Sequence, residues 1–213
     1  MISEEFSFIF VHIPRTAGQS IENFFLDRSK SRGDIRNRSL LRPNFNRRKG
    51  PPRLAHLTAE EYLTKSYVES RFFAKYFKFA FIRNPWQRLF SEYCYSYQHK
   101  HKNFKLFLFK HFPTKKNDSY FKLQANFRHV LPQYQYIFND QGKQLVDFIG
   151  RFENLESDFK VICKKLNIVY QPLPKTNRSN PDTLDYRRFY DAETRDFVAN
   201  FYAEDISRFN YSF

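Results

Sequence analysis

The segment 14–20, Pro-Arg-Thr-Ala-Gly-Gln-Ser, has the residue types of an anion-binding turn. It joins an apolar stretch over 6–12, typical of a buried strand, to an amphipathic pattern over 18–28 that predicts a helix. Backbone N–H groups at a helix N-terminus attract anions, and Arg15 adds a full positive charge. Gln19 stands where a Walker loop has lysine, and the first glycine of that loop is absent. The segment therefore predicts an anion site that differs from an ATP loop.

A second strand–helix junction carries a second cation. The apolar stretch 78–83 predicts a buried strand that ends in Arg83, and Asn84-Pro85 supplies an N-cap and a proline at the first helical position. Ser91 lies two turns into that helix, on the side that can face the strand end. An ATP-driven phosphate-loop enzyme would end this strand in an acidic residue that holds Mg²⁺. The two arginine side chains, Arg15 and Arg83, and the absence of such a carboxylate predict a doubly anionic ligand that is bound without a metal ion.

Strand and helix patterns alternate along the chain and position these two junctions. A third strand is predicted over 145–152, and Thr58 and Glu61 have the spacing of a capping box. Helices are predicted from Thr58, over 68–76, from Trp86, less regularly over 102–130, over 155–166 and over 191–206. The alternation predicts an α/β fold of the P-loop-NTPase-like, three-layer kind, with a central parallel sheet flanked by helices. The length and the absence of repeats predict a single domain over 1–213.

The charge balance predicts an anionic partner. The chain has 36 Lys and Arg residues against 22 Asp and Glu residues, for a net charge of +14. Nine of these cations and a single acid, Asp34, lie in the segment 29–53. A basic nucleic-acid-binding protein without enzymatic activity is therefore the alternative hypothesis, although the sequence has no recognised nucleic-acid motif. The aromatic content of 20% is interpreted first as core filling.

The location of the protein is predicted from its composition. The N-terminus is acidic where a secretory signal would be basic, and no apolar run approaches the roughly 18–20 residues that span a bilayer. Cys94 and Cys163 are the two cysteines and are expected to be free thiols. We expect a cytoplasmic protein without a transmembrane segment, and the sequence leaves the oligomeric state open.

Several blocks of the sequence resemble PAPS-dependent carbohydrate sulfotransferases, in particular the heparan sulfate 2-O-sulfotransferases and their bacterial relatives. The blocks are HIPRTAGQS (12–20), AHLTAEEY (55–62), FAFIRNPWQRLFSEY (79–93), VDFIGRFENLESDF (146–159) and DAETRDFVANFYAEDISRFNY (191–211). They occur in the order of the family and span nearly the whole chain.

The resemblance implies a donor and the residues that hold it. The donor is 3′-phosphoadenosine 5′-phosphosulfate (PAPS), and no metal is required. The acceptor is a hydroxyl or an amine, by family default a carbohydrate hydroxyl, and it can be acidic. Arg83 and Ser91 would hold the 3′-phosphate. The 5′-phosphosulfate would be held by Arg15, Thr16, Ala17, Gly18, Gln19 and Ser20.

The resemblance also implies catalytic residues. Arg15 stands where the family has lysine, and it supplies charge to the oxygen that bridges sulfur and phosphorus but cannot give up a proton. His56 lies in the block that resembles the family's histidine segment and is the expected base, since imidazole accepts a proton near neutral pH. Glu60 and Glu61 remain the alternatives for this role.

Other polar residues are not assigned to the donor site. His12 is expected to be a hydrogen-bonded structural histidine, and the pair His99 and His101 to be a solvated helix end without a metal. A nucleotide kinase is excluded by Gln19 and by Arg83 at the strand end. Four further cations can line the cleft that binds the nucleotide or the acceptor, but their spacing alone does not place them there: Lys175, Arg178, Arg187 and Arg188.

Overall fold

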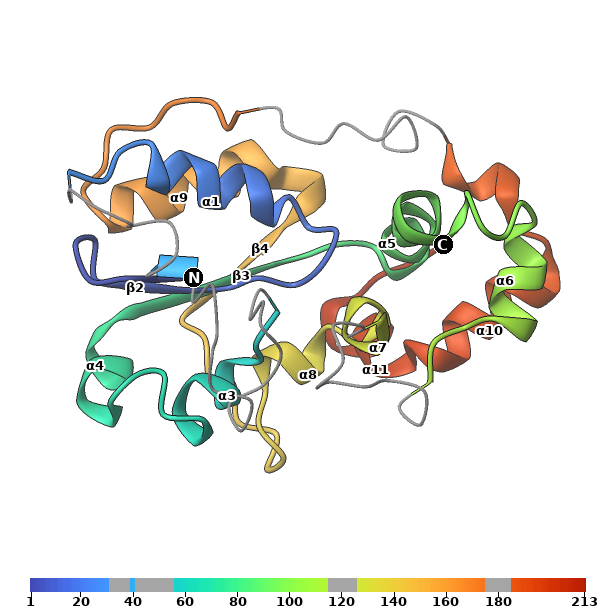
Figure 1. Cartoon of the computed structure of the whole chain (residues 1–213), viewed down its shortest axis with the longest axis horizontal. Coiled ribbons are helices and arrows are strands. Elements are labelled where there is room, and N and C mark those ends of the chain that lie inside the picture. The colour runs from blue at the N-terminus through green and yellow to red at the C-terminus, as the bar shows by residue number, and fades with distance from the viewer. Residues whose placement is uncertain (31–38, 41–55, 115–125, 175–184) are drawn as a thin grey trace.

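A four-stranded sheet lies at the centre of the computed structural model, which describes residues 1–30, 39–40, 56–114, 126–174 and 185–213 (Figure 1). In spatial order the strands are β1 (Ile2–Ser3), β2 (Phe8–Val11), β3 (Phe77–Ile82) and β4 (Phe148–Arg151). The last three run parallel, with Phe10 opposite Phe79 and Phe81 opposite Gly150. The predicted α/β class and the three predicted strands are confirmed.

The first strand was not predicted, and it makes the sheet mixed rather than wholly parallel. β1 pairs antiparallel with β2, and Ile2 lies opposite Ile9. The chain reverses before β2 through Ser7, whose φ is 53°. A strand of two residues is too short to show an alternating pattern, so the sequence does not reveal it. The strand predicted over 6–12 correspondingly begins at Phe8.

The two faces of the sheet carry different side chains. One face is aromatic, and α1 (Gly18–Leu26) and α9 (Leu155–Lys165) cover it (Figure 1). The other is aliphatic, and α3 (Ala59–Thr64), α4 (Ser70–Lys75) and α8 (Tyr134–Ile137) cover it. The aromatic face is formed by Phe8, Phe10, Phe79 and Phe81, and the aliphatic face by Ile9, Val11, Ala80 and Ile82. Because both faces of the sheet are buried, these strands appear in the sequence as continuous apolar runs.

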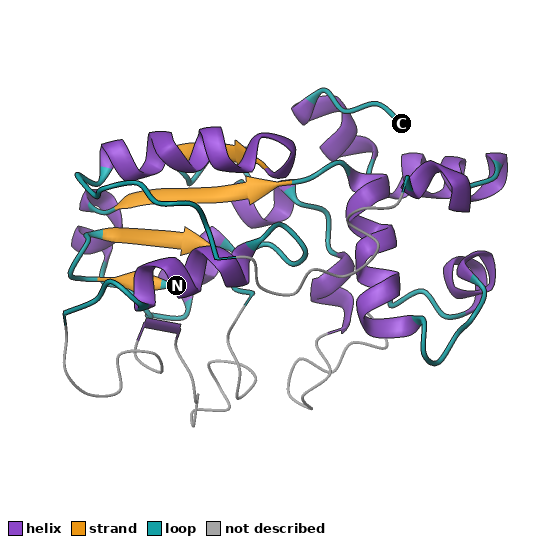
Figure 2. Cartoon of the chain, turned by 90° about the horizontal axis from the view of Figure 1, so that it is seen from above, coloured by secondary structure: helices purple, strands orange, loops and turns teal. Residues whose placement is uncertain are grey.

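A third group of helices lies beyond the carboxyl ends of the strands (Figure 2). It contains α5 (Pro85–Glu92), a π-helical turn (Tyr93–Tyr97), α6 (Phe104–Lys110), α7 (Asn126–Val130), α10 (Ala192–Phe201) and α11 (Ala203–Phe209). Short 3₁₀ turns are formed by Phe152–Asn154 and Tyr186–Phe189. The helix that was predicted from Trp86 is present, and its apolar residues are buried: Trp86, Leu89, Phe90, Tyr93 and Tyr97. Many of the described aromatic residues therefore fill cores, as predicted, whereas four are exposed: Phe72, Tyr95, Phe109 and Phe189.

The predicted helix starts are confirmed by their caps. Thr58 and Glu61 form a capping box, and the Asn84 side chain accepts a hydrogen bond from the backbone N–H of Trp86 at 3.1 Å. The helix predicted over 191–206 is in fact two helices, because Tyr202 leaves the helical conformation between α10 and α11.

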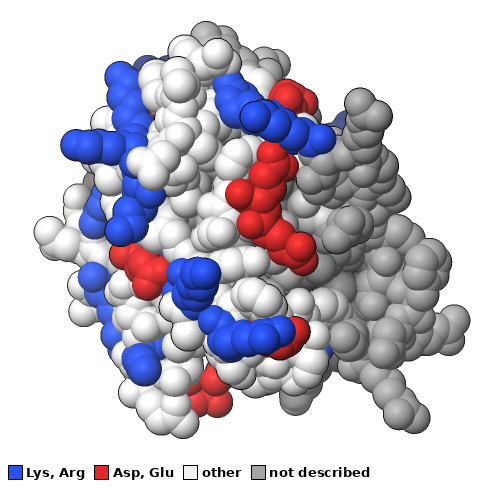
Figure 3. Space-filling view, turned by 90° about the vertical axis from the view of Figure 1, so that its left-hand side faces the viewer, with Lys and Arg blue, Asp and Glu red and all other residues white. Residues whose placement is uncertain are grey.

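The net positive charge falls mostly outside the described residues, which contain 23 Lys and Arg against 19 Asp and Glu. Of the predicted basic segment 29–53, only residues 29–30 and 39–40 are described. On the face at the amino ends of the parallel strands, basic and acidic side chains are both spread over the surface (Figure 3).

Within the described ranges, no helix has the length and apolarity needed to cross a membrane.

Candidate active site

The loop between β2 and α1, residues 12–17, has an unusual backbone. Arg15 and Ala17 both have left-handed backbone conformations, with φ of 66° and 65°. Each costs a non-glycine residue about 1–2 kcal/mol, and such strain is concentrated at functional sites. Between them Thr16 is fully buried, and its hydroxyl donates to the Ile13 carbonyl at 2.9 Å. The turn is therefore held from inside while α1 begins at Gly18.

Gly18 is required because the ring of His12 lies against it. A Cβ on Gly18 would lie 2.0 Å from Cδ2 and from Nε2 of His12. The ring is fixed in turn by Glu22, whose carboxylate accepts a hydrogen bond from His12 Nδ1 at 2.7 Å. Both side chains are buried, so His12 has the hydrogen-bonded, supporting position that was expected for it.

The two predicted junctions meet at the carboxyl edge of β2 and β3. Arg15 donates to the Ser91 hydroxyl from Nε at 3.1 Å and from Nη2 at 3.0 Å. Arg83 donates from Nη1 to the Arg15 carbonyl at 3.2 Å and lies 3.9 Å above the ring of Phe152. Arg83 and Ser91 are each only 1% exposed. Two cations held at one edge favour an anion there.

Arg88 holds this edge together and was missed in the sequence. Its side chain is buried and donates to three carbonyls, those of Pro14 at 3.1 Å, Leu131 at 3.1 Å and His129 at 2.9 Å. It therefore ties the β2–α1 loop to the end of α7 and to Leu131, which follows it. The sequence carried no signal for it, because Arg88 shares a helix side with Ser91 and Glu92, opposite Trp86 and Phe90, where a charged side chain is expected to face solvent.

His56 lies beside the loop with a defined tautomer. Its Nδ1 is 3.0 Å from the His12 carbonyl, and because a carbonyl only accepts, Nδ1 carries the hydrogen. The neutral ring then has its lone pair on Nε2. The ring contacts His12 and His129 edge to face, with centroids 4.6 Å and 4.9 Å away.

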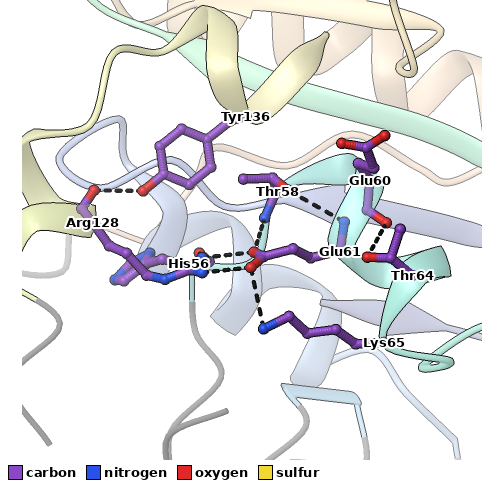
Figure 4. Close-up of polar contacts among 8 residues, drawn as sticks. All are labelled: His56, Thr58, Glu60, Glu61, Thr64, Lys65, Arg128 and Tyr136. Carbon is purple, nitrogen blue, oxygen red and sulfur yellow. Dashed lines mark hydrogen bonds and ion pairs between the residues drawn. The ribbon is translucent and has the colours of Figure 1, made fainter. Parts of the chain in front are cut away.

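Arg128 links the Glu61 carboxylate to the backbone of His56 (Figure 4). Arg128 donates to both carboxylate oxygens of Glu61 and to the His56 carbonyl. Burial alone would raise the pKa of Glu61, but the hydrogen bond and charge of Arg128, with smaller effects of Thr58 and Lys65, lower it. Glu61 is therefore a poor proton acceptor. The Glu60 carboxylate points away from His56 in the same view.

The remaining predicted residues are placed as follows. Gln19 is exposed and Ser20 buried in the first turn of α1. His101 stacks on His111 at 4.0 Å, and among the described residues no group of three or more His, Cys, Asp or Glu could hold a metal. Arg187 and Arg188 lie in the 3₁₀ turn beside Asp185, whereas residues 175 and 178 lie outside the described ranges.

The structure is that of an α/β protein in which a strained loop follows the first parallel strand and lies beside two arginine side chains. The profile of the Sulfotransferase family matches residues 1–212, so the chain belongs to that family. An uncharacterized protein of Archaeoglobus fulgidus is 35% identical over 127 residues, which cover 60% of this chain and 96% of the relative. No solved structure matches the chain significantly.

Proposed function

We propose that this chain transfers the sulfuryl group of PAPS to a hydroxyl group, with a carbohydrate as the acceptor. Membership of the Sulfotransferase family supports sulfuryl transfer in general. The main support for PAPS as the donor is that Arg15, Arg83 and Ser91 lie together at one edge of the sheet.

The donor fits this edge through its two anionic ends. The loop binds the 5′-phosphosulfate through Arg15, Thr16, Ala17, Gly18, Gln19 and Ser20. Arg83 and Ser91 bind the 3′-phosphate. The Ser91 oxygen accepts from Arg15, so its own O–H points elsewhere and is suited to donate to a phosphate oxygen. PAPS supplies the sulfuryl group and a phosphate leaving group.

His56 takes the acceptor proton in this proposal. Nε2 accepts the proton while the acceptor oxygen bonds to sulfur, and the bond from sulfur to the bridging oxygen breaks with its electrons on the leaving phosphate. The guanidinium of Arg15 compensates the charge that develops there. A base in this position contributes about 10²–10⁴ in rate.

Ligand binding tests the donor. We expect PAP (3′-phosphoadenosine 5′-phosphate) in EDTA to raise the melting temperature and to bind in calorimetry, and ATP with Mg²⁺ to bind more weakly. Stabilisation by an oligonucleotide but not by PAP would instead support the nucleic-acid alternative that the net charge of +14 suggests.

Substitution of the 3′-phosphate residues tests the assignment within the site. Arg83→Ala should weaken PAP binding by several-fold to about a hundredfold, because a charged hydrogen bond of about 1.5–3 kcal/mol is lost. Arg71→Ala is the matched control, since that side chain is 73% exposed on α4. Ser91→Ala removes a smaller group should Arg83→Ala fail to fold. Unchanged PAP affinity in both folded variants contradicts the assignment.

Transfer of label tests the acceptor class. Incubation of the protein with [³⁵S]PAPS and an extract of the source organism should label carbohydrate material. Label confined to peptide or lipid fractions would overturn the carbohydrate assignment and leave the donor assignment standing.

A further inference from the structure

A buried carboxylate on α5 is incompletely satisfied. Glu92 is 1% exposed, and its Oε1 accepts from His129 Nδ1 at 3.1 Å and from the Ser96 hydroxyl at 2.5 Å. Within the described part of the chain, Oε2 has no hydrogen-bond partner. Burying a carboxylate in this way is costly, and purely structural carboxylates are normally fully hydrogen-bonded. The arrangement therefore requires a reason other than stability.

His129 has the hydrogen bonding of a proton acceptor. A carboxylate accepts the Nδ1 hydrogen, so the neutral ring has its lone pair on Nε2, and the same carboxylate offsets the charge that the ring gains with a proton. The side chain of His129 is 30% exposed and thus open to an incoming group. His12 and Glu22 form a similar pair, but the His12 side chain is only 10% exposed.

His129 also lies at the site described above. Its ring is edge to face with His56, at 4.9 Å between centroids. Its carbonyl is held by Arg88, which also holds the carbonyl of Pro14 in the β2–α1 loop. The preceding residue, Arg128, binds the carbonyl of His56. Three contacts therefore fix His129 next to both the loop and His56.

We propose that His129, backed by Glu92, is a second proton acceptor for the hydroxyl substrate; this inference rests on the proposed function. The acceptor O–H gives its proton to Nε2 of His56 as the oxygen–sulfur bond forms, Nε2 of His129 takes this proton from His56, and the bridging bond breaks with its electron pair on PAP. Glu92 is a positioning residue that holds the His129 ring.

Three variants test the proposal: His129→Gln, Glu92→Gln and, as the matched control, His99→Gln at an exposed position. Release of PAP from PAPS is measured with a pool of unsulfated chondroitin, heparosan and dextran, together with calorimetric PAP affinity and melting temperature. We expect His129→Gln and Glu92→Gln to lower kcat about tenfold or more, with PAP affinity within about twofold of wild type. His99→Gln should match wild type in all three measurements.

A second variant separates base chemistry from packing. His129→Phe keeps a ring against His56 but has no proton acceptor, so it should lose kcat as His129→Gln does. Wild-type turnover in His129→Phe or in His129→Gln overturns this inference alone. A wild-type protein that neither binds PAP nor releases it from PAPS overturns the proposed function itself.

Discussion

Replacement of Gly18 by alanine tests how tightly the β2–α1 loop is built. The added Cβ would lie 2.0 Å from two ring atoms of His12, where real contacts are at least 3.0 Å. The ring or the loop must therefore shift by about 1 Å. The His12 ring is held by Glu22 at 2.7 Å, so it cannot move without losing that hydrogen bond. Overpacking of this kind costs about 1–3 kcal/mol.

The expected effect is measurable in unfolding experiments. For a chain of this length, a loss of about 1–3 kcal/mol lowers the melting temperature by about 2–12 °C. PAP affinity should fall as well, because the shift displaces the loop that is proposed to hold the phosphosulfate.

A double-mutant cycle provides the control. His12→Ala removes the ring, so Gly18→Ala should cost at least about 0.5 kcal/mol less in that background than in wild type. Equal costs in the two backgrounds, or no cost in wild type, would refute the steric argument.

Three further predictions follow from the same region. Arg88→Met should lower the free energy of unfolding by at least about 3 kcal/mol, measured with urea, because one buried and two partly buried carbonyls lose a charged donor. A smaller loss would contradict the inference that Arg88 holds the β2–α1 loop against α7. Glu61 has a lowered pKa in the folded state, so its stabilisation is present above its unfolded pKa of about 4.5 and is lost as pH falls through the folded value. In Glu61→Gln the free energy of unfolding should therefore fall less steeply below pH 4.5 than in wild type. An unchanged dependence on pH would contradict the stabilising ion pair of Glu61 with Arg128. His56→Ala should keep its melting temperature and PAP affinity while kcat falls about tenfold or more; a smaller fall excludes base catalysis of that size.

Local patterns in the sequence were sufficient for most of the fold. The buried strands, the Thr58 capping box and the Asn84-Pro85 helix start depend on neighbouring residues, so their prediction was accurate. The antiparallel β1 and the break at Tyr202 were missed, because two residues or one residue carry no periodic signal.

The site was predictable where it lies on a strand–helix junction and less so elsewhere. Arg15, Arg83 and Ser91 could be expected to meet because neighbouring parallel strands end at one edge. The contact of His56 with His129 joins two distant segments, and spacing along the chain says nothing of such a contact. Arg88 was hidden because it lies on the polar side of its helix, where a solvent-exposed charge is expected, yet the structure buries it.

The central claim is that the edge formed by β2 and β3 holds a nucleotide with both a 5′ and a 3′ anionic group. Calorimetric titration in EDTA with PAP and with adenosine 5′-monophosphate tests it most directly, since the two ligands differ only in the 3′-phosphate. The proposed contacts of Arg83 and Ser91 predict at least about tenfold tighter binding of PAP, from a charged hydrogen bond of about 1.5–3 kcal/mol. Equal affinity for the two nucleotides, or binding of neither, would contradict the claim.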